Sequence, residues 1–256
     1  MGVVTDLMKL NGRAALVTGG SRGIGRSIAL ALAEFGADVA VTCESRVEAA
    51  EEVAAEARKL GVRAVAVQAS LGDRDGPKQT FDKTLAALGR IDILVLNASL
   101  QLPTPWIETT REQFEQQVTI NLRASMELMQ RVAPGMTERK WGRILTIGSV
   151  QEARPHPDML VYAATKSAQE SLSRNLAKQL GLHGITVNNI APGVILTDRS
   201  TSRLTDDAYR QRVLNNIPTR TFGEPEDCAA AAVLICSDAG RYINGANLFI
   251  DGGMQL

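Results

Sequence analysis

The stretch of sequence that decides the fold is TGGSRGIG, residues 18–25. It follows an apolar, β-branched run at residues 14–18, which predicts a buried strand, and it leads straight into a helical pattern that stops before Gly36. Glycines between a strand and a helix permit a tight turn and let a pyrophosphate approach the backbone at the positive helix N-terminus. The stretch therefore indicates a dinucleotide-binding turn, against the simpler interpretation that its glycines only tighten the turn.

Short apolar runs alternate with longer amphipathic segments along the rest of the chain. We expect strands at residues 14–18, 39–42, 64–67, 91–96, 143–147, 186–190 and 247–250. Most of these runs are apolar almost throughout, as in strands that are covered on both faces. The alternation predicts an α/β, doubly wound Rossmann-type fold with a mostly seven-stranded parallel sheet flanked by helices on both faces. Because no repeat or linker divides the sequence, we expect one domain over residues 1–256.

Two irregular segments, residues 149–160 and 191–205, follow predicted strands. Ligands of open α/β sheets bind beyond the carboxyl ends of the strands, so these segments are where chemistry is expected. The second segment carries a run of polar side chains, namely Thr197, Asp198, Arg199, Ser200, Thr201, Ser202 and Arg203. Such polarity fits a mobile lid, around residues 194–216, that orders when a cofactor binds, and it fits a solvated loop equally well.

Composition excludes several classes of protein. The chain of 256 residues has 28 basic and 28 acidic side chains, so it lacks the electrostatic footprint of a nucleic-acid or anionic-membrane binder. No window approaches the ~18 apolar residues of a membrane span, and no signal-type apolar stretch follows the N-terminus, so we expect a cytoplasmic protein. The three cysteines show no metal or redox spacing and the two histidines lack ligand-like neighbours, so neither a metal site nor a Ser/His/Asp hydrolase is expected.

A nucleoside triphosphatase is a rival interpretation of the glycine stretch. Residues 20–27 read GSRGIGRS, close to a phosphate-binding loop, but Arg26 stands where that loop needs a lysine. The strand expected at residues 91–96 is followed by Asn97, where a magnesium-holding Asp would be required. The sequence therefore disfavours this interpretation.

Tyr162 and Lys166 lie four positions apart, so on a helix they share one face. A phenol with an ordinary pKa near ~10 is a poor acid or base at neutral pH, but a nearby cation lowers that pKa and makes proton exchange with an alcohol or carbonyl feasible. Ser149 follows the strand expected at residues 143–147, where its hydroxyl can hydrogen-bond a substrate oxygen. Taken alone, the Tyr/Lys pair also fits a solvated helix face and Ser149 fits a helix cap.

With these residues considered together, the chain resembles the short-chain dehydrogenase/reductase family over essentially its whole length. The motifs that carry the resemblance are the glycine pattern of residues 18–25, Asn97-Ala98, Asn121, Ser149, Tyr162-x-x-x-Lys166, Pro192-Gly193 and the ending Asp251-Gly252-Gly253. The resemblance implies a catalytic set of Asn121, Ser149, Tyr162 and Lys166. In that set Tyr162 is the general acid/base and Ser149 positions the reacting oxygen. Lys166 lowers the tyrosine pKa and holds the nicotinamide ribose, while Asn121 supports a water in a proton relay.

The resemblance also implies a nicotinamide cofactor. The residues expected to bind it are Gly19, Ser21, Arg22, Gly23, Ile24, Gly25, Glu44, Ser70, Leu71, Asn97, Ala98, Tyr162, Lys166, Pro192, Gly193, Val194 and Thr197. By the resemblance, residues 192–194 and Thr197 meet the nicotinamide, and Asn97 and Ala98 line the adenosine ribose side. Ser70 replaces an Asp that the family often has near the adenine.

Other departures from the family pattern concern the choice of cofactor. Ser99 stands where the family has the glycine of its Asn-Asn-Ala-Gly motif. Cys43 occupies the strand-end position at which NAD enzymes commonly carry an acid, although Glu44 follows it. Arg22, with Arg46 nearby, suits a 2′-phosphate. We therefore favour NADP(H) and leave NAD(H) open.

The side chains expected to contact substrate are Ser149, Gln151, His156, Met159 and Tyr162. His156 lies between two prolines and is also compatible with an exposed loop position. Together these observations predict an NAD(P)(H)-dependent oxidoreductase that interconverts a secondary alcohol and a ketone or other carbonyl of a small molecule. The alternatives are a 3-oxoacyl-thioester (acyl carrier protein) reductase and, from another class, a non-catalytic NAD(P)-binding sensor or scaffold. The resemblance further implies a homo-oligomer, usually a tetramer.

Overall fold

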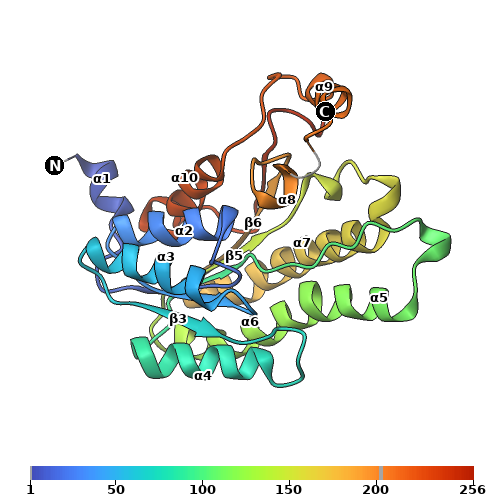
Figure 1. Cartoon of the computed structure of the whole chain (residues 1–256). Coiled ribbons are helices and arrows are strands. Elements are labelled where there is room, and N and C mark those ends of the chain that lie inside the picture. The colour runs from blue at the N-terminus through green and yellow to red at the C-terminus, as the bar shows by residue number, and fades with distance from the viewer. Residues whose placement is uncertain (1, 202–203) are drawn as a thin grey trace.

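The computed structural model describes residues 2–201 and 204–256 and contains one parallel sheet of seven strands (Figure 1). The strands are β1 Ala14–Val17, β2 Asp38–Cys43, β3 Ala64–Gln68, β4 Ile93–Leu96, β5 Gly142–Ile147, β6 Ile185–Pro192 and β7 Asn247–Ile250. Their order in the sheet is β3-β2-β1-β4-β5-β6-β7, so the direction of winding reverses between β1 and β4. A crevice forms at such a switch point, and ligands of this architecture bind there.

Helices cover both faces of the sheet (Figure 1). Their bounds are α1 Val3–Met8, α2 Gly23–Glu34, α3 Val47–Lys59, α4 Gly76–Leu88, α5 Arg111–Val118, α6 Ala124–Glu138, α7 Leu160–Leu180, α8 Asp198–Thr201, α9 Asp207–Asn215 and α10 Pro225–Cys236. One core cluster packs α2, α3 and α10 on the sheet through side chains such as Leu32, Val53 and Val233. The other packs α4, α6 and α7 on the opposite face, with Leu88 and Leu128 fully or almost fully buried. The predicted doubly wound α/β fold is confirmed.

All seven strands lie where the sequence predicts them, and the differences are confined to their ends. The strand expected at residues 91–96 begins at Ile93, directly after the buried Asp92. Its carboxylate is fully buried and accepts the Ala14 N–H at 3.0 Å. β6 continues past the expected residue 190 to Pro192, at the edge of the switch-point crevice.

The stretch expected to be irregular, residues 191–205, contains the short helix α8, and the segment expected to form a lid, around residues 194–216, contains α8 and α9. Asp206 caps α9 by accepting the Tyr209 N–H at 2.7 Å. Ser202 and Arg203, which the sequence assigned to this lid, lie outside the described residues. In the part of the chain that the structure describes, no helix is long and apolar enough to cross a membrane.

We predict that Asp92→Asn destabilises the fold. Arg90 and Arg139 both pair with the buried carboxylate, at 2.6 and 3.0 Å, so the neutral side chain leaves two guanidinium groups poorly compensated. Losing one partner of such a cluster costs about 3 kcal/mol in the free energy of unfolding, measured by urea denaturation. Asp82→Asn, which breaks the exposed pair with Lys78, is the control and should change it by less than about 0.5 kcal/mol. Equal effects of the two substitutions would contradict this account.

Candidate active site

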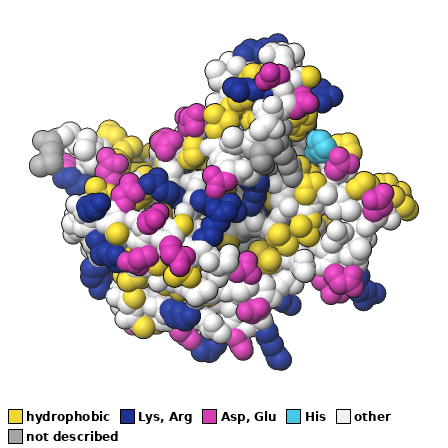
Figure 2. All heavy atoms as spheres, viewed as in Figure 1, with side chains coloured by type: hydrophobic (Ala, Val, Ile, Leu, Met, Phe, Trp, Pro, Cys, Tyr) yellow, Lys and Arg dark blue, Asp and Glu magenta, His cyan; other side chains and the backbone are white. Residues whose placement is uncertain are grey.

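A groove of about 620 Å³ opens at the switch point, beyond the carboxyl ends of β1, β4, β5 and β6. It is lined by all the predicted substrate contacts and by most predicted cofactor contacts. Gly25 and Ser70 are absent from its lining among the described residues, and so is Asn121. In Figure 2, Lys and Arg side chains gather near the middle of this face of the molecule. Most residues that the sequence analysis selected thus line one groove, although they are far apart in the chain.

The glycine loop is held in place by its neighbour β4. Thr18 Oγ1 accepts the N–H groups of Asn97 and Ala98, each at 3.0 Å. Asn97 in turn donates from its side-chain amide to the carbonyls of Thr18 and Gly19 at 2.9 and 3.0 Å. A Cβ on Gly25 would lie 2.4 Å from that amide nitrogen, so Gly25 is required for packing the loop and does not line the groove. The backbone geometry expected of a dinucleotide-binding turn is present.

The acidic and basic side chains expected to bind the adenosine part of the cofactor already make contacts within the protein. Ser70 Oγ donates to the Glu44 carboxylate at 2.8 Å, which holds this acid toward β3. Arg22 and Arg46 both reach the same oxygen of Asp198, at 3.5 and 3.4 Å. These two arginines come from the N-termini of α2 and α3, whereas Asp198 opens α8. Two guanidinium groups therefore converge on one anionic oxygen at the edge of the groove.

Ser149 is held by a residue that sequence reasoning missed. The Ser149 N–H donates to the carboxylate of Glu152 at 2.9 Å, and the Ser149 hydroxyl accepts the Gln151 N–H at 3.2 Å. Burial raises the pKa of Glu152, although hydrogen bonds from Ser149 and from two asparagine side chains act to lower it. A Cβ on Gly148 would lie 1.9 Å from the Glu152 carboxylate, so this arrangement needs a glycine before Ser149. The Ser-x-x-Glu spacing of a capping box was the available signal.

Lys166 lies on α7 with 1 % of its surface exposed. Its Nζ donates to the carbonyl of Ile147 at 2.6 Å and to Gln169 Oε1 at 3.1 Å. Burial lowers the pKa of Lys166 to about 7, helped by the positive charge of Arg199 and opposed by Glu152. Its Nζ lies 5.6 Å from the centre of the Tyr162 ring, as expected of residues that share a helix face. Near neutral pH the amine therefore exists in both protonation states.

Tyr162 differs from the sequence-based expectation in its electrostatics. Burial raises the pKa of its phenol, although the charge of Arg199 and hydrogen bonds with the Ser149 and Ser99 side chains act to lower it. Arg199 is thus a cation that acts on the phenol in addition to the neighbouring Lys166, and the pKa-lowering role that the resemblance gives to Lys166 stays a prediction. The Ser149 side chain thus lies near enough to the phenol to affect its pKa, and both residues line the groove.

Asn121 is completely buried in a π-helical turn between α5 and α6. Its side-chain oxygen accepts the Leu100 N–H at 2.8 Å, and its amide donates to the Leu100 carbonyl at 2.9 Å and to Thr165 Oγ1 at 3.0 Å. These bonds tie the loop after β4 to α7. The side chain therefore fixes the groove's wall from behind, and the water-binding role implied by the resemblance stays a prediction.

The expected substrate contacts Gln151, His156 and Met159 surround the mouth of the groove. Gln151 Oε1 accepts the His156 N–H at 2.6 Å, which folds the loop onto itself. His156 Nδ1 accepts the Asp158 N–H at 3.2 Å, and the histidine side chain is half-exposed. Within the described part of the chain, no group of three or more His, Cys, Asp or Glu side chains is placed to hold a metal ion.

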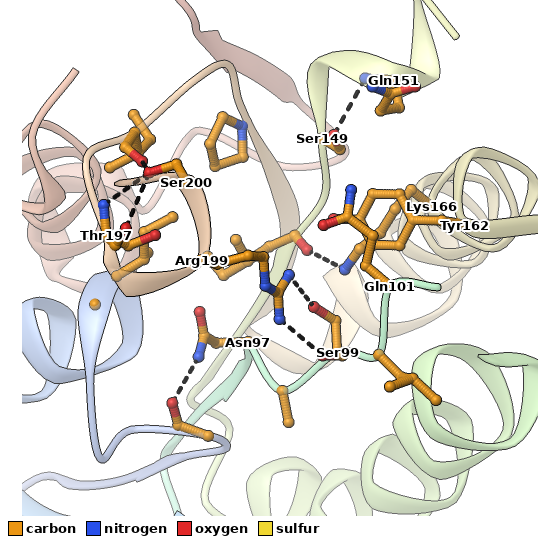
Figure 3. A pocket seen from close by; sticks show the side chains of 18 of the residues that line it. Asn97, Ser99, Gln101, Ser149, Gln151, Tyr162, Lys166, Thr197, Arg199 and Ser200 are labelled. Atoms are coloured by element: carbon orange, nitrogen blue, oxygen red, sulfur yellow. Dashed lines mark hydrogen bonds between the residues drawn. The ribbon is translucent and has the colours of Figure 1, made fainter. Parts of the chain in front are cut away.

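Ser99 and Arg199 occupy the centre of the site. The sequence marked Ser99 only as a departure from the family motif, and Arg199 only as one of the polar side chains of the lid segment. Arg199 donates to the Ser99 hydroxyl at 3.3 Å and to the Ser99 carbonyl at 3.0 Å. Figure 3 shows its guanidinium between the α8 segment and the Tyr162/Lys166 pair. Nothing in the spacing of the sequence could indicate this contact, because the two residues are 100 positions apart.

Comparisons with known proteins agree with this architecture. A family model described as enoyl-(acyl carrier protein) reductase matches residues 19–255. The chain is 36% identical over 244 residues to the 3-oxoacyl-[acyl-carrier-protein] reductase FabG of Staphylococcus epidermidis, covering 95% of this chain and 99% of that protein. It is also 36% identical over 249 residues to the 7alpha-hydroxysteroid dehydrogenase of Escherichia coli K12, covering 97% and 96% of the two chains.

Solved structures extend these similarities. A 3-oxoacyl (acyl-carrier-protein) reductase from Agrobacterium tumefaciens with NADP bound superposes with a TM-score of 0.93 at 31% identity, covering 99% of this chain and 98% of that one. A 7 alpha-hydroxysteroid dehydrogenase complexed with NADH and 7-oxo glycochenodeoxycholic acid gives a TM-score of 0.92 at 36% identity, covering 97% and 96%. The chain belongs to the short-chain dehydrogenase/reductase family of oxidoreductases.

The depressed pKa of Lys166 predicts a pH-dependent cost of folding. Unfolding restores the ordinary value of 10.5, so between pH 7 and that value the unfolded chain binds more protons than the folded one. The penalty for burying this amine is complete below pH 7 and is relieved as the pH rises. We expect the stability of the wild type, relative to Lys166→Met, to rise by up to about 1.4 kcal/mol per pH unit in this window.

Urea denaturation of both proteins across that window measures the difference, and Lys166→Gln provides a second neutral side chain. Titrating cysteines and surface groups are common to all three proteins and cancel. Parallel stability curves for wild type and variants would show that Lys166 keeps an ordinary pKa.

Proposed function

We propose that this protein is an NADP(H)-dependent oxidoreductase that interconverts a secondary alcohol and the corresponding ketone or other carbonyl. The observation that carries the proposal is the hydroxyl pair of Tyr162 and Ser149, which lies with the buried amine of Lys166 in the groove at the switch point. Membership of a family of oxidoreductases supports the same reaction class. The residues that would carry it are on separate elements, α7 and the loop after β5.

The groove fits a dinucleotide. Gly19 and Gly23 have positive φ, so the loop before α2 presents backbone N–H groups and a helix N-terminus to an incoming pyrophosphate. Arg22 and Arg46 supply the cations that a 2′-phosphate needs. Relatives with NADP and with NADH bound support a nicotinamide dinucleotide, and the paired arginines favour the phosphorylated form, with NAD(H) still accessible.

In the reduction direction, the Tyr162 hydroxyl donates its proton to the carbonyl oxygen, and in oxidation the phenolate takes it back. The Ser149 hydroxyl donates a second hydrogen bond to the same oxygen and so fixes its position. The nicotinamide, when bound, supplies or accepts the hydride. Lys166 holds the nicotinamide ribose, and Arg199 opposes the effect of burial on the phenol. The other proposed cofactor contacts, from Ser21 to Thr197, orient the dinucleotide along the groove.

A second candidate function is a 3-oxoacyl-thioester reductase. The names of the similar reductases from Staphylococcus epidermidis and Agrobacterium tumefaciens favour it. Activity with an acetoacetyl thioester distinguishes it from reduction of free small carbonyls.

Cytoplasmic location and assembly into a homotetramer complete the proposal, and light scattering of the purified protein tests the assembly.

The proposal is tested with a panel of secondary alcohols and carbonyls, followed through nicotinamide absorbance. We expect turnover of at least one pair, and we expect Tyr162→Phe to fold, bind NADPH and lose activity by about 10²–10⁴-fold. Tyr242→Phe, at a fully exposed tyrosine, is the matched control and should keep wild-type activity. Tight NADPH binding without turnover across the panel would instead support a non-catalytic sensor.

Asp198 provides a test of the cofactor assignment. Its carboxylate neutralises Arg22 and Arg46 and would repel a 2′-phosphate, so Asp198→Asn should tighten NADPH binding by about twofold to fivefold. The affinity for NADH, which lacks that phosphate, should change by less than about twofold. Fluorescence titrations measure both dissociation constants, with Asp207→Asn on the exposed start of α9 as control. If the dissociation constants of NADPH and NADH changed equally, Arg22 and Arg46 would not be the residues that bind the 2′-phosphate.

A further inference from the structure

Basic side chains line the part of the groove formed by the segment that contains α8 and α9. Arg199 and Arg212 reach it from the segment that contains α8 and α9, and His156 reaches it from the loop after β5. Among the described residues that line the groove, Glu44 is the one acid, and it lies at the opposite, adenosine end beside Ser70. A chain with equal numbers of acidic and basic residues thus concentrates cations, without a lining carboxylate, where the substrate would enter.

Arg199 is the arginine whose charge acts on both Tyr162 and Lys166. Its two hydrogen bonds to Ser99, at 3.3 and 3.0 Å, hold its guanidinium in the groove. Ser99 also hydrogen-bonds Tyr162, so Arg199 and the phenol share a neighbour. The charge of Arg199 acts to lower the pKa of both Tyr162 and Lys166. In Figure 3 the side chain extends from the α8 segment across the groove toward these two residues.

We propose that the substrate carries a carboxylate and that Arg199 binds it, with Arg212 adding to the favourable field. This inference rests on the proposed function and names its substrate class as oxo acids and the corresponding hydroxy acids. A guanidinium presents a planar pair of N–H donors that matches a carboxylate. A neutral thioester offers no such group, so the inference favours free acids over thioester substrates.

The same guanidinium chemistry could serve a phosphate of the dinucleotide. The position of Arg199 near the phenol, with Arg22 and Arg46 at the adenosine end, favours the substrate. The experiment therefore measures substrate selectivity and cofactor affinity separately in each protein.

The test compares oxo acids with their methyl esters, in a series from 2-oxopropanoate to 5-oxohexanoate that varies the distance between carbonyl and carboxylate. The wild type should reduce the best acid with a kcat/KM at least about tenfold above that of its ester. Arg199→Gln should bring this acid/ester ratio close to one, mainly through KM, and Arg199→Lys should keep part of it. Arg210→Gln removes a charge from the same region outside the groove lining and should retain the wild-type ratio.

Three results overturn the inference. One is a wild type that reduces acids and esters equally well, and another is an unchanged ratio in Arg199→Gln. The third is a variant that loses acid and ester turnover alike while its NADPH dissociation constant rises, because Arg199 would then bind a cofactor phosphate. Neutral carbonyls turned over in preference to acids leave the proposed oxidoreductase function intact, whereas no turnover of any acid, ester or panel compound removes both proposals.

Discussion

The site depends on the hydrogen bonds that close the reversal of strand order between β1 and β4. Thr18 Oγ1 donates to the Val95 carbonyl at 3.2 Å and accepts two N–H groups from the chain that leaves β4. Parallel neighbours whose connections run in opposite directions leave a crevice at this point. The bonds fix how wide that crevice is, because they join the glycine loop to the loop that carries Ser99.

A second buried polar chain supports the reacting groups from below. The Ser125 hydroxyl donates to the Asn121 carbonyl at 2.9 Å and accepts the Gln169 amide at 2.8 Å, and Gln169 accepts the amine of Lys166 at 3.1 Å. These side chains are fully or almost fully buried, so each unmade bond would cost free energy. This series of hydrogen bonds couples the position of Lys166 to the packing of α6 against α7. It also explains why a lysine is tolerated in the protein interior, because the amine has hydrogen-bond partners there.

The sequence predicted the architecture well because its signals are local. Strand periodicity and the glycine stretch lie within short windows, and the Tyr162/Lys166 spacing is a helical one. Strand ends were less accurate, as at β4, which begins just after Asp92, a buried acid that pairs with Arg90 and with the distant Arg139. The sequence marked Ser99 only as a departure from the family pattern and Arg199 only as a polar residue of the lid segment, so it did not indicate that the two make contact. Their contact and its effect on Tyr162 arise only from tertiary structure.

The placement of α8 joins the two ends of the groove. Asp198 contacts the arginines at the adenosine end, while the next residue, Arg199, reaches toward the phenol. A four-residue helix spans only about 6 Å, so neighbouring side chains on it cannot move independently over larger distances. Asp198 and Arg199 are consecutive residues of this one turn, so the ion pairs with Arg22 and Arg46 and the hydrogen bonds to Ser99 are anchored on the same short piece of backbone.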